Sequence, residues 1–177
     1  MTADPLRLVP LLLLLVGLGA LAAALVAQHV FGLAPCILCL YQRVPYGLAA
    51  LLGAVALVPM LPPRWRVGLV ALAGIGFLAN AGIAVFHVGV EQHWWAGTAS
   101  CSGGDAAFMD GVGVGAADML GLLDGTQSLA PALPRCDSPA WSLFGVTMAG
   151  YNVVASLILG LSTLAAAKRL AANRRDY

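Results

Sequence analysis

Two cysteines stand three residues apart, at Cys36 and Cys39, in the stretch APCILCLYQRVP of residues 34–45. Arg43 follows four residues after Cys39, so on a helix it would share the face of that thiol. The spacing suits metal ligation, thiol–disulfide exchange, a structural disulfide, or simple packing of small apolar side chains. A helix N-terminus or a nearby cation lowers the pKa of a thiol and makes it a better attacking group. The redox interpretation therefore gives a function to both cysteines and to the arginine.

A metal site is the weaker interpretation of these cysteines. Structural zinc sites use four Cys or His ligands, often as paired Cys-x-x-Cys motifs. The two remaining cysteines are far apart in sequence, and none of the three histidines shows ligand spacing with the first pair. These residues are Cys101, Cys136, His29, His87 and His93. We therefore predict no metal site.

The second pair of cysteines, Cys101 and Cys136, allows two roles. A disulfide that closes a loop of about 35 residues would stabilise the folded state by roughly 3 to 4 kcal/mol in the chain-entropy model, which makes a structural staple plausible. The segment between them is rich in glycine, and an exposed disulfide there would also be open to attack by a partner thiolate. The residues alone leave both roles open.

Two pairs of cysteines make an electron relay attractive, with one pair meeting a soluble protein and the other meeting a lipid-soluble acceptor. A membrane quinone is such a two-electron acceptor. Arg43 would then stabilise the negative charge that develops on the reduced quinone oxygen. The competing interpretation of Arg43 is a side chain that reaches to the membrane surface and anchors its helix.

The elements that position these residues are set by composition. The chain of 177 residues is 60% hydrophobic and 10% charged, with a mean hydropathy of +0.89, which is too apolar for a water-soluble domain. Charge-free runs long enough to cross a bilayer lie at about residues 8–27, 44–60, 67–88 and 142–167. We predict an all-α membrane protein, an antiparallel four-helix transmembrane bundle that forms one domain over residues 1–177. Small residues near the end of the first run would suit a cleaved signal, but its apolar stretch is longer than a signal core, and we expect a retained helix.

Orientation follows from the Lys and Arg residues. With four spans, seven of the nine fall on one side, and only Arg43 and Arg135 fall on the other. The positive-inside rule then predicts that both termini are cytoplasmic and that all four cysteines lie outside. In a bacterium this would be the inner membrane with the cysteines in the oxidising periplasm, where disulfides persist. The outer segments carry mostly acidic residues, so no nucleic-acid partner is expected.

Two outer segments result, at about residues 28–43 and 89–141. The first is short and carries the Cys-x-x-Cys motif. The second is a long periplasmic loop between helices 3 and 4, too rich in Gly and Pro for a compact domain of its own. Within it, residues 116–125 have apolar residues at helical spacing, and we expect a short helix on the membrane surface.

Together these features resemble a known family, disulfide bond formation protein B, the DsbB family of inner-membrane quinone reductases. The motif CILCLYQR ahead of the second span, four spans, and a large second outer loop with two more cysteines carry the resemblance. The stretch CDSPAWSLFGVTM, residues 136–148, is also similar to the family's approach to its fourth helix. The resemblance covers nearly the whole chain.

The resemblance implies a mechanism and a set of partners. A disulfide between Cys101 and Cys136 would accept electrons from a periplasmic DsbA-like thioredoxin-fold oxidase, with Cys101 forming the mixed disulfide. Cys136 would exchange with Cys36, and Cys39 would pass the electrons to ubiquinone or menaquinone beside Arg43. The family can also carry a histidine near the quinone at the end of the third helix. Here VEQHWW places Gln92 at about that point, with His93 next, and we expect Gln92 to bind the quinone.

Two other functions remain open. A vitamin K epoxide reductase-like quinone reductase also couples a membrane Cys-x-x-Cys motif to a quinone, but there the motif comes late in the chain. A non-enzymatic scaffold or carrier would have static disulfides that staple its outer loops. Against a carrier, none of the four predicted spans contains an acidic residue for a transport path.

Overall fold

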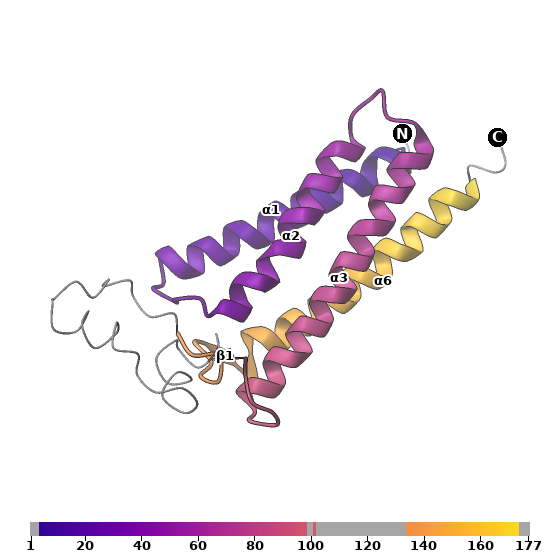
Figure 1. Cartoon of the computed structure of the whole chain (residues 1–177). Coiled ribbons are helices and arrows are strands. Elements are labelled where there is room, and N and C mark those ends of the chain that lie inside the picture. The colour runs from indigo at the N-terminus through magenta and orange to yellow at the C-terminus, as the bar shows by residue number, and fades with distance from the viewer. Residues whose placement is uncertain (1–3, 99–100, 102–133, 174–177) are drawn as a thin grey trace, which may run out of the picture.

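The computed structural model describes residues 4–98, 101 and 134–173. Four helices in this part of the chain are long and apolar enough to cross a membrane. They are α1 (Pro5–His29), α2 (Ile37–Ala56), α3 (Pro63–Glu91) and α6 (Met148–Asn173), and they lie lengthwise against one another (Figure 1). The predicted four-helix bundle of a multi-pass membrane protein is confirmed. The surface helix predicted at residues 116–125 lies outside the described residues.

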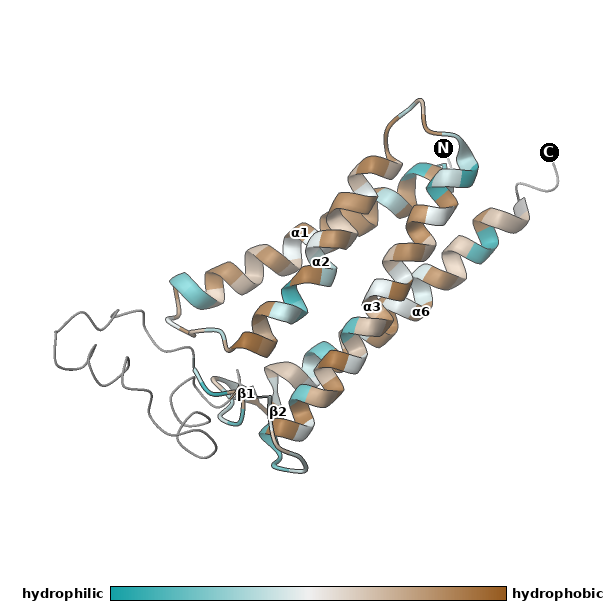
Figure 2. Ribbon diagram, viewed as in Figure 1, coloured by the Kyte–Doolittle hydropathy of each residue, from teal (hydrophilic) through white to brown (hydrophobic). Residues whose placement is uncertain are grey.

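The helices bury little of their apolar surface against each other. Only 17% to 39% of the residues in each membrane-length window are buried, so most of these apolar residues are not covered by other helices. Figure 2 shows that α1 and α2 are hydrophobic along most of their length. Such a surface is stable in lipid and not in water. The described protein therefore has the surface of a membrane-embedded bundle.

Helix packing uses close backbone contacts. The most extensive contact joins α3 to α6, α1 packs along α2, and α2 against α3 links the two pairs. At Gly53 of α2 an added Cβ would lie 2.6 Å from the carbonyl oxygen of Pro10 in α1, so only glycine permits this approach. Phe77, Val70 and Ala49 fill the centre of the bundle.

The two ends of the bundle differ. The chain termini lie at one end with the α2–α3 turn, and the segments that carry the cysteines lie at the other (Figure 1). In the turn, the Arg66 guanidinium donates hydrogen bonds to the carbonyl oxygens of Val58, Pro59 and Leu61, at 2.9 to 3.1 Å. This arginine therefore ties together carbonyl groups of the turn that follows α2.

The helix boundaries differ from the predicted spans at both ends of the bundle, and three differences at the cysteine end bear on the site. Helix α2 begins at Ile37 and not at residue 44, because Cys36 caps it and its sulfur accepts a hydrogen bond from the Cys39 N–H. Helix α3 continues to Glu91, three residues beyond the predicted span, so an acidic residue lies at its end. Helix α6 begins at Met148 and not at residue 142.

A short hairpin accounts for the late start of α6. Strand β1 (Ser142–Leu143) pairs antiparallel with β2 (Val146–Thr147). The two residues between them, Phe144 and Gly145, have φ values of 51° and 76°, as a two-residue type I′ turn requires. The hairpin leads directly into α6 and fixes the position of Thr147 beside α3.

Candidate functional site

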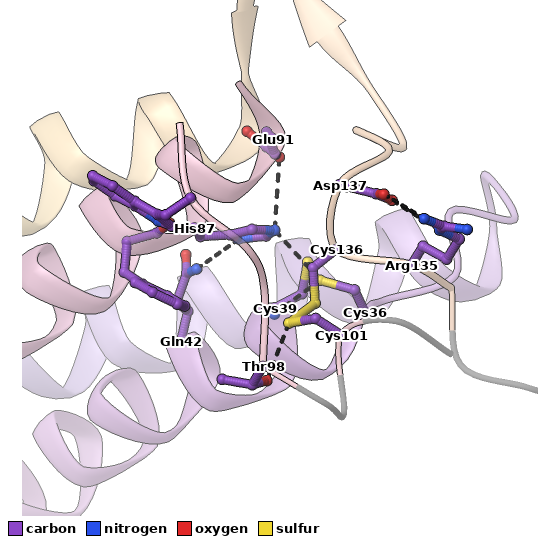
Figure 3. Close-up of a disulfide and its surroundings, with 12 residues drawn as sticks. Cys36, Cys39, Gln42, His87, Glu91, Thr98, Cys101, Arg135, Cys136 and Asp137 are labelled. Atoms are coloured by element: carbon purple, nitrogen blue, oxygen red, sulfur yellow. Dashed lines mark hydrogen bonds and ion pairs between the residues drawn. A yellow bond between two sulfur atoms is a disulfide. The ribbon is translucent and has the colours of Figure 1, made fainter. Parts of the chain in front are cut away.

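The first pair of thiols lies at the N-terminus of α2. The Cys36 and Cys39 sulfurs are 2.8 Å apart, both are free thiols, and Cys36 is buried (Figure 3). Because Cys36 is the N-cap and Cys39 belongs to the first turn, the i,i+3 spacing directs both side chains to the same point. The redox-suited geometry predicted for the Cys-x-x-Cys motif is therefore present.

The Cys36 thiol is strongly acidic. Its pKa falls from an ordinary 9.0 to about 4, chiefly because the Cys39 thiol donates a hydrogen bond to its sulfur. Burial opposes the shift, and a hydrogen bond from His87 adds to it. At neutral pH Cys36 is a thiolate, the form that attacks disulfides and binds metals.

His87 of α3 is the residue that the sequence did not identify. Its Nε2 lies 3.5 Å from the Cys36 sulfur, and its Nδ1 accepts a hydrogen bond of 2.9 Å from the Gln42 amide. Because Nδ1 is an acceptor, Nε2 carries the proton and points it toward the sulfur. The ring is 3% exposed. An ionisable residue inside a span is a candidate functional residue by default, and this signal was present in the sequence.

Glu91 lies one turn beyond His87 and is also buried. One carboxylate oxygen, Oε1, is 3.7 Å from His87 Nε2, and the other, Oε2, accepts a 2.5 Å hydrogen bond from the Thr147 hydroxyl. Among the described residues no Lys or Arg forms an ion pair with this carboxylate. The hairpin before α6 thus holds a buried acid beside the histidine.

The second pair, Cys101 and Cys136, forms a disulfide with a Cα–Cα distance of 5.0 Å. Both cysteines are buried, and they pack in one apolar cluster with Cys36, Leu38 and Val90. Figure 3 shows the disulfide beside Cys36 and Cys39. The Thr98 hydroxyl donates a 3.4 Å hydrogen bond to the Cys101 sulfur. The fold therefore brings together all four cysteines that we predicted to be catalytic.

A cavity of about 270 Å³ opens beside the first pair. Its walls are mainly small apolar side chains of α1, while Cys39, Gln42, Arg43 and His87 line its polar side. The Arg43 guanidinium donates a 2.8 Å hydrogen bond to Gln28 Oε1 at the end of α1. Arg43 thus lines the same cavity as Cys39, as its spacing predicted.

Gln92 and His93 lie elsewhere. Both are exposed just beyond the end of α3, and neither lines the cavity. His87, more than one turn earlier on the helix, lines it instead. The prediction that Gln92 binds a quinone came from the family resemblance, and it stays a prediction.

Several known proteins with similar sequences are named disulfide bond formation protein B. Over 176 residues the chain is 28% identical to disulfide bond formation protein B of Polaromonas naphthalenivorans, a match that covers 92% of this chain and 93% of that protein. It is 29% identical over 153 residues to disulfide bond formation protein B 2 of Pseudomonas entomophila, covering 85% and 84%. A match to disulfide bond formation protein B of Neisseria gonorrhoeae has 37% identity over 83 residues, and there the chain spans about half of the relative, 49%.

No solved structure matches the chain significantly. The family described as disulfide bond formation protein DsbB matches residues 6–166, a range that covers most of each of the four helices and contains all four cysteines. Because that match covers far more than half of the sequence, the chain belongs to the DsbB family.

Proposed function

We propose that this protein is a membrane disulfide oxidoreductase that oxidises the dithiol of a periplasmic thioredoxin-fold protein and delivers the electrons to a membrane quinone. Family membership supports the oxidoreductase role. One observation supports the electron transfer from a partner dithiol to a quinone. The Cys101–Cys136 disulfide contacts a second thiol pair, and that pair borders an apolar cavity.

The lining of the cavity fits a quinone. A quinone is a flat apolar ring with two polar oxygens and a long apolar tail, and the α1 wall supplies small residues such as Ala20, Ala24 and Ala27. Arg43 offers a cation, and His87 an N–H, at the polar side where Cys39 also lies. A bound quinone would supply the acceptor for two electrons and two protons.

The first exchange takes place at Cys101 and Cys136. A partner thiolate attacks the Cys101 sulfur, the Cys101–Cys136 bond breaks, and Cys136 leaves as a thiolate. The second thiol of the partner then resolves the mixed disulfide, so the partner leaves oxidised and both cysteines are reduced. The Thr98 hydroxyl beside the Cys101 sulfur can hydrogen-bond a thiolate formed there.

The second exchange moves the same electrons to Cys36 and Cys39. The Cys136 thiolate attacks Cys36 of a Cys36–Cys39 disulfide, and Cys39 leaves as a thiolate. Cys101 then attacks Cys136 in the resulting Cys36–Cys136 disulfide. The Cys101–Cys136 bond forms again, and Cys36 is released. The thiol pair that results is the state of the described structure. When Cys36 and Cys39 form their disulfide again, they give up two electrons and two protons, and His87 can hold one proton at Nε2 beside Cys36.

Quinone reduction by the purified protein tests the proposal. The full-length protein is mixed with a short-chain quinone and a reduced thioredoxin-fold oxidase, and the quinone absorbance is followed. We expect a loss of quinone that requires both proteins and disappears in Cys39→Ser. No loss, with the Cys101–Cys136 disulfide unchanged in the presence of the reduced oxidase, would support a stapled scaffold instead.

A further inference from the structure

We propose that Cys36, Cys39 and His87, with Glu91 as the fourth ligand, bind a divalent cation of the zinc type when the two cysteines are reduced. The sulfur, sulfur and nitrogen atoms of the first three residues all lie within 4.8 Å of one another. Two cysteines and one histidine are frequent zinc ligands. This inference goes beyond the proposed function, because it requires neither a quinone nor a partner protein.

The distances match those of a tetrahedral site. With Zn–S bonds of about 2.3 Å and a Zn–N bond of about 2.0 Å, a tetrahedral ion separates S and N by about 3.5 Å and the two sulfurs by about 3.8 Å. The Cys36 sulfur and His87 Nε2 are already 3.5 Å apart. The two sulfurs, at 2.8 Å, must separate by about 1 Å, and Cys39 borders the cavity into which its side chain can turn.

Glu91 lies outside this group of three and must move toward the sulfurs to become the fourth ligand. Its Oε1 is 3.7 Å from Nε2, close to the separation of about 3.4 Å between N and O ligands of a tetrahedral zinc. Thr147 binds only Oε2, so Oε1 remains free to ligate. A buried carboxylate beside a thiolate, without a Lys or Arg ion pair among the described residues, is an environment that a divalent cation stabilises.

A second layer of side chains can orient the histidine. Nε2 must lose its proton to ligate, so Nδ1 must carry the proton and donate it. Gln42 already contacts Nδ1 at 2.9 Å, and a half-turn of its amide presents Oε1 as the acceptor. Asn152 contacts the other end of the same amide and can turn with it.

The reaction is an exchange of protons for metal, without electron transfer. As Zn²⁺ forms two Zn–S bonds, any proton still on Cys36, Cys39 or Nε2 is released to solvent, and no bond between sulfurs forms or breaks. A Cys36–Cys39 disulfide has no thiolate to offer, so the oxidised protein does not bind the ion in this way. The cation therefore holds the pair in its reduced state and prevents the disulfide from forming again.

Sequence spacing gives no sign of this group of residues, because the histidine comes from another helix. His87 is 51 residues from Cys36, so no local motif includes it. Only the packing of α2 against α3 brings the ligands together.

Metal binding by the full-length protein in detergent tests the site. We use the Cys101→Ser/Cys136→Ser variant so that only the first pair can ligate, reduce it, remove the reductant without oxygen, and titrate with Co²⁺ or Zn²⁺. We expect one ion per chain, thiolate-to-cobalt charge-transfer absorption, and protection of Cys36 and Cys39 from alkylation. His87→Ala should weaken binding by about tenfold or more, while His29→Ala, which changes an exposed histidine, should not.

Three outcomes would overturn the site. These are equal affinity in the parent and His87→Ala, equal affinity of the reduced and the Cys36–Cys39 oxidised protein, and alkylation that Zn²⁺ does not slow. If His87→Ala fails to fold, Glu91→Gln is the second ligand variant, because it keeps the shape of the side chain. The assay contains no quinone and no thioredoxin-fold protein, so its failure leaves the relay proposal standing.

Discussion

Cys36 carries the largest electrostatic perturbation outside the spans, and it predicts a pH dependence. Because its pKa is lowered from 9.0 to about 4, the thiolate persists as the pH falls from neutral and is lost only near that lower value. In the reduced Cys101→Ser/Cys136→Ser variant, the ultraviolet absorbance of the thiolate should follow this course. In Cys39→Ala the midpoint of the Cys36 titration should rise toward 9.0, because the hydrogen bond that mainly stabilises the Cys36 thiolate is gone. A midpoint that is identical with and without Cys39 would contradict this assignment.

Arg43 gives a second prediction at the residue scale. Replacing it with alanine should raise the KM for quinone by about tenfold or more, because a hydrogen bond from a charged donor contributes about 1.5–3 kcal/mol. Steady-state quinone reduction measures this, and the thermal midpoint should not fall. Arg64→Ala is the control, since Arg64 is exposed near the opposite end of the bundle. If the quinone dependence of Arg43→Ala overlays that of the parent, Arg43 is an anchor of its helix only.

At the scale of elements, the α1–α2 contact predicts a difference between two glycines. Gly53→Ala should destabilise the protein by about 1–3 kcal/mol, because its Cβ would meet the α1 backbone at Pro10 and Leu14. Gly19→Ala should be neutral or stabilising, because nothing lies within 4 Å of its Cβ. Thermal unfolding in detergent compares them, and an equal loss in both would show that the α1–α2 approach is not tight.

Hydropathy was sufficient to predict the four helices, because bilayer length is a strong constraint on apolar runs. It did not predict their ends. Hydropathy put Cys36 and Cys39 ahead of the helix, whereas the cap at Cys36 starts α2 seven residues earlier than residue 44. It extended the last span through Phe144 and Gly145, whose turn depends on backbone angles that apolar composition does not reveal.

The site was predictable only in part for the same reason. Cysteine spacing identified the reactive pair, and the family resemblance supplied the Cys101–Cys136 pairing. The contacts of His87 with Cys36 and with Glu91 depend on the face of α3 that turns toward α2, and a helix that is apolar nearly all round gives no such signal.

At the scale of the whole molecule, the orientation of the bundle in the membrane predicts which end of it a cysteine reagent can reach from outside the cell. Met60 and Phe144 are both 92% exposed, and they lie at opposite ends of the bundle, in the α2–α3 turn and in the hairpin. In a background without the native cysteines, Phe144→Cys should react with a membrane-impermeant maleimide in intact cells. Met60→Cys should react only after lysis, because the excess of Lys and Arg at its end predicts a cytoplasmic location. The reverse pattern would invert the proposed topology and put the redox site in the cytoplasm.

The turn held by Arg66 is a pivot about which α2 and α3 can change their relative tilt. Its hydrogen bonds to three carbonyl oxygens hold the α2–α3 turn in place at the end of the bundle remote from the thiols. Helix α2, with 20 residues, extends about 30 Å from that point. A change of tilt between α2 and α3 about this turn would therefore move Arg66 little and would produce its largest displacement where Cys36 meets His87.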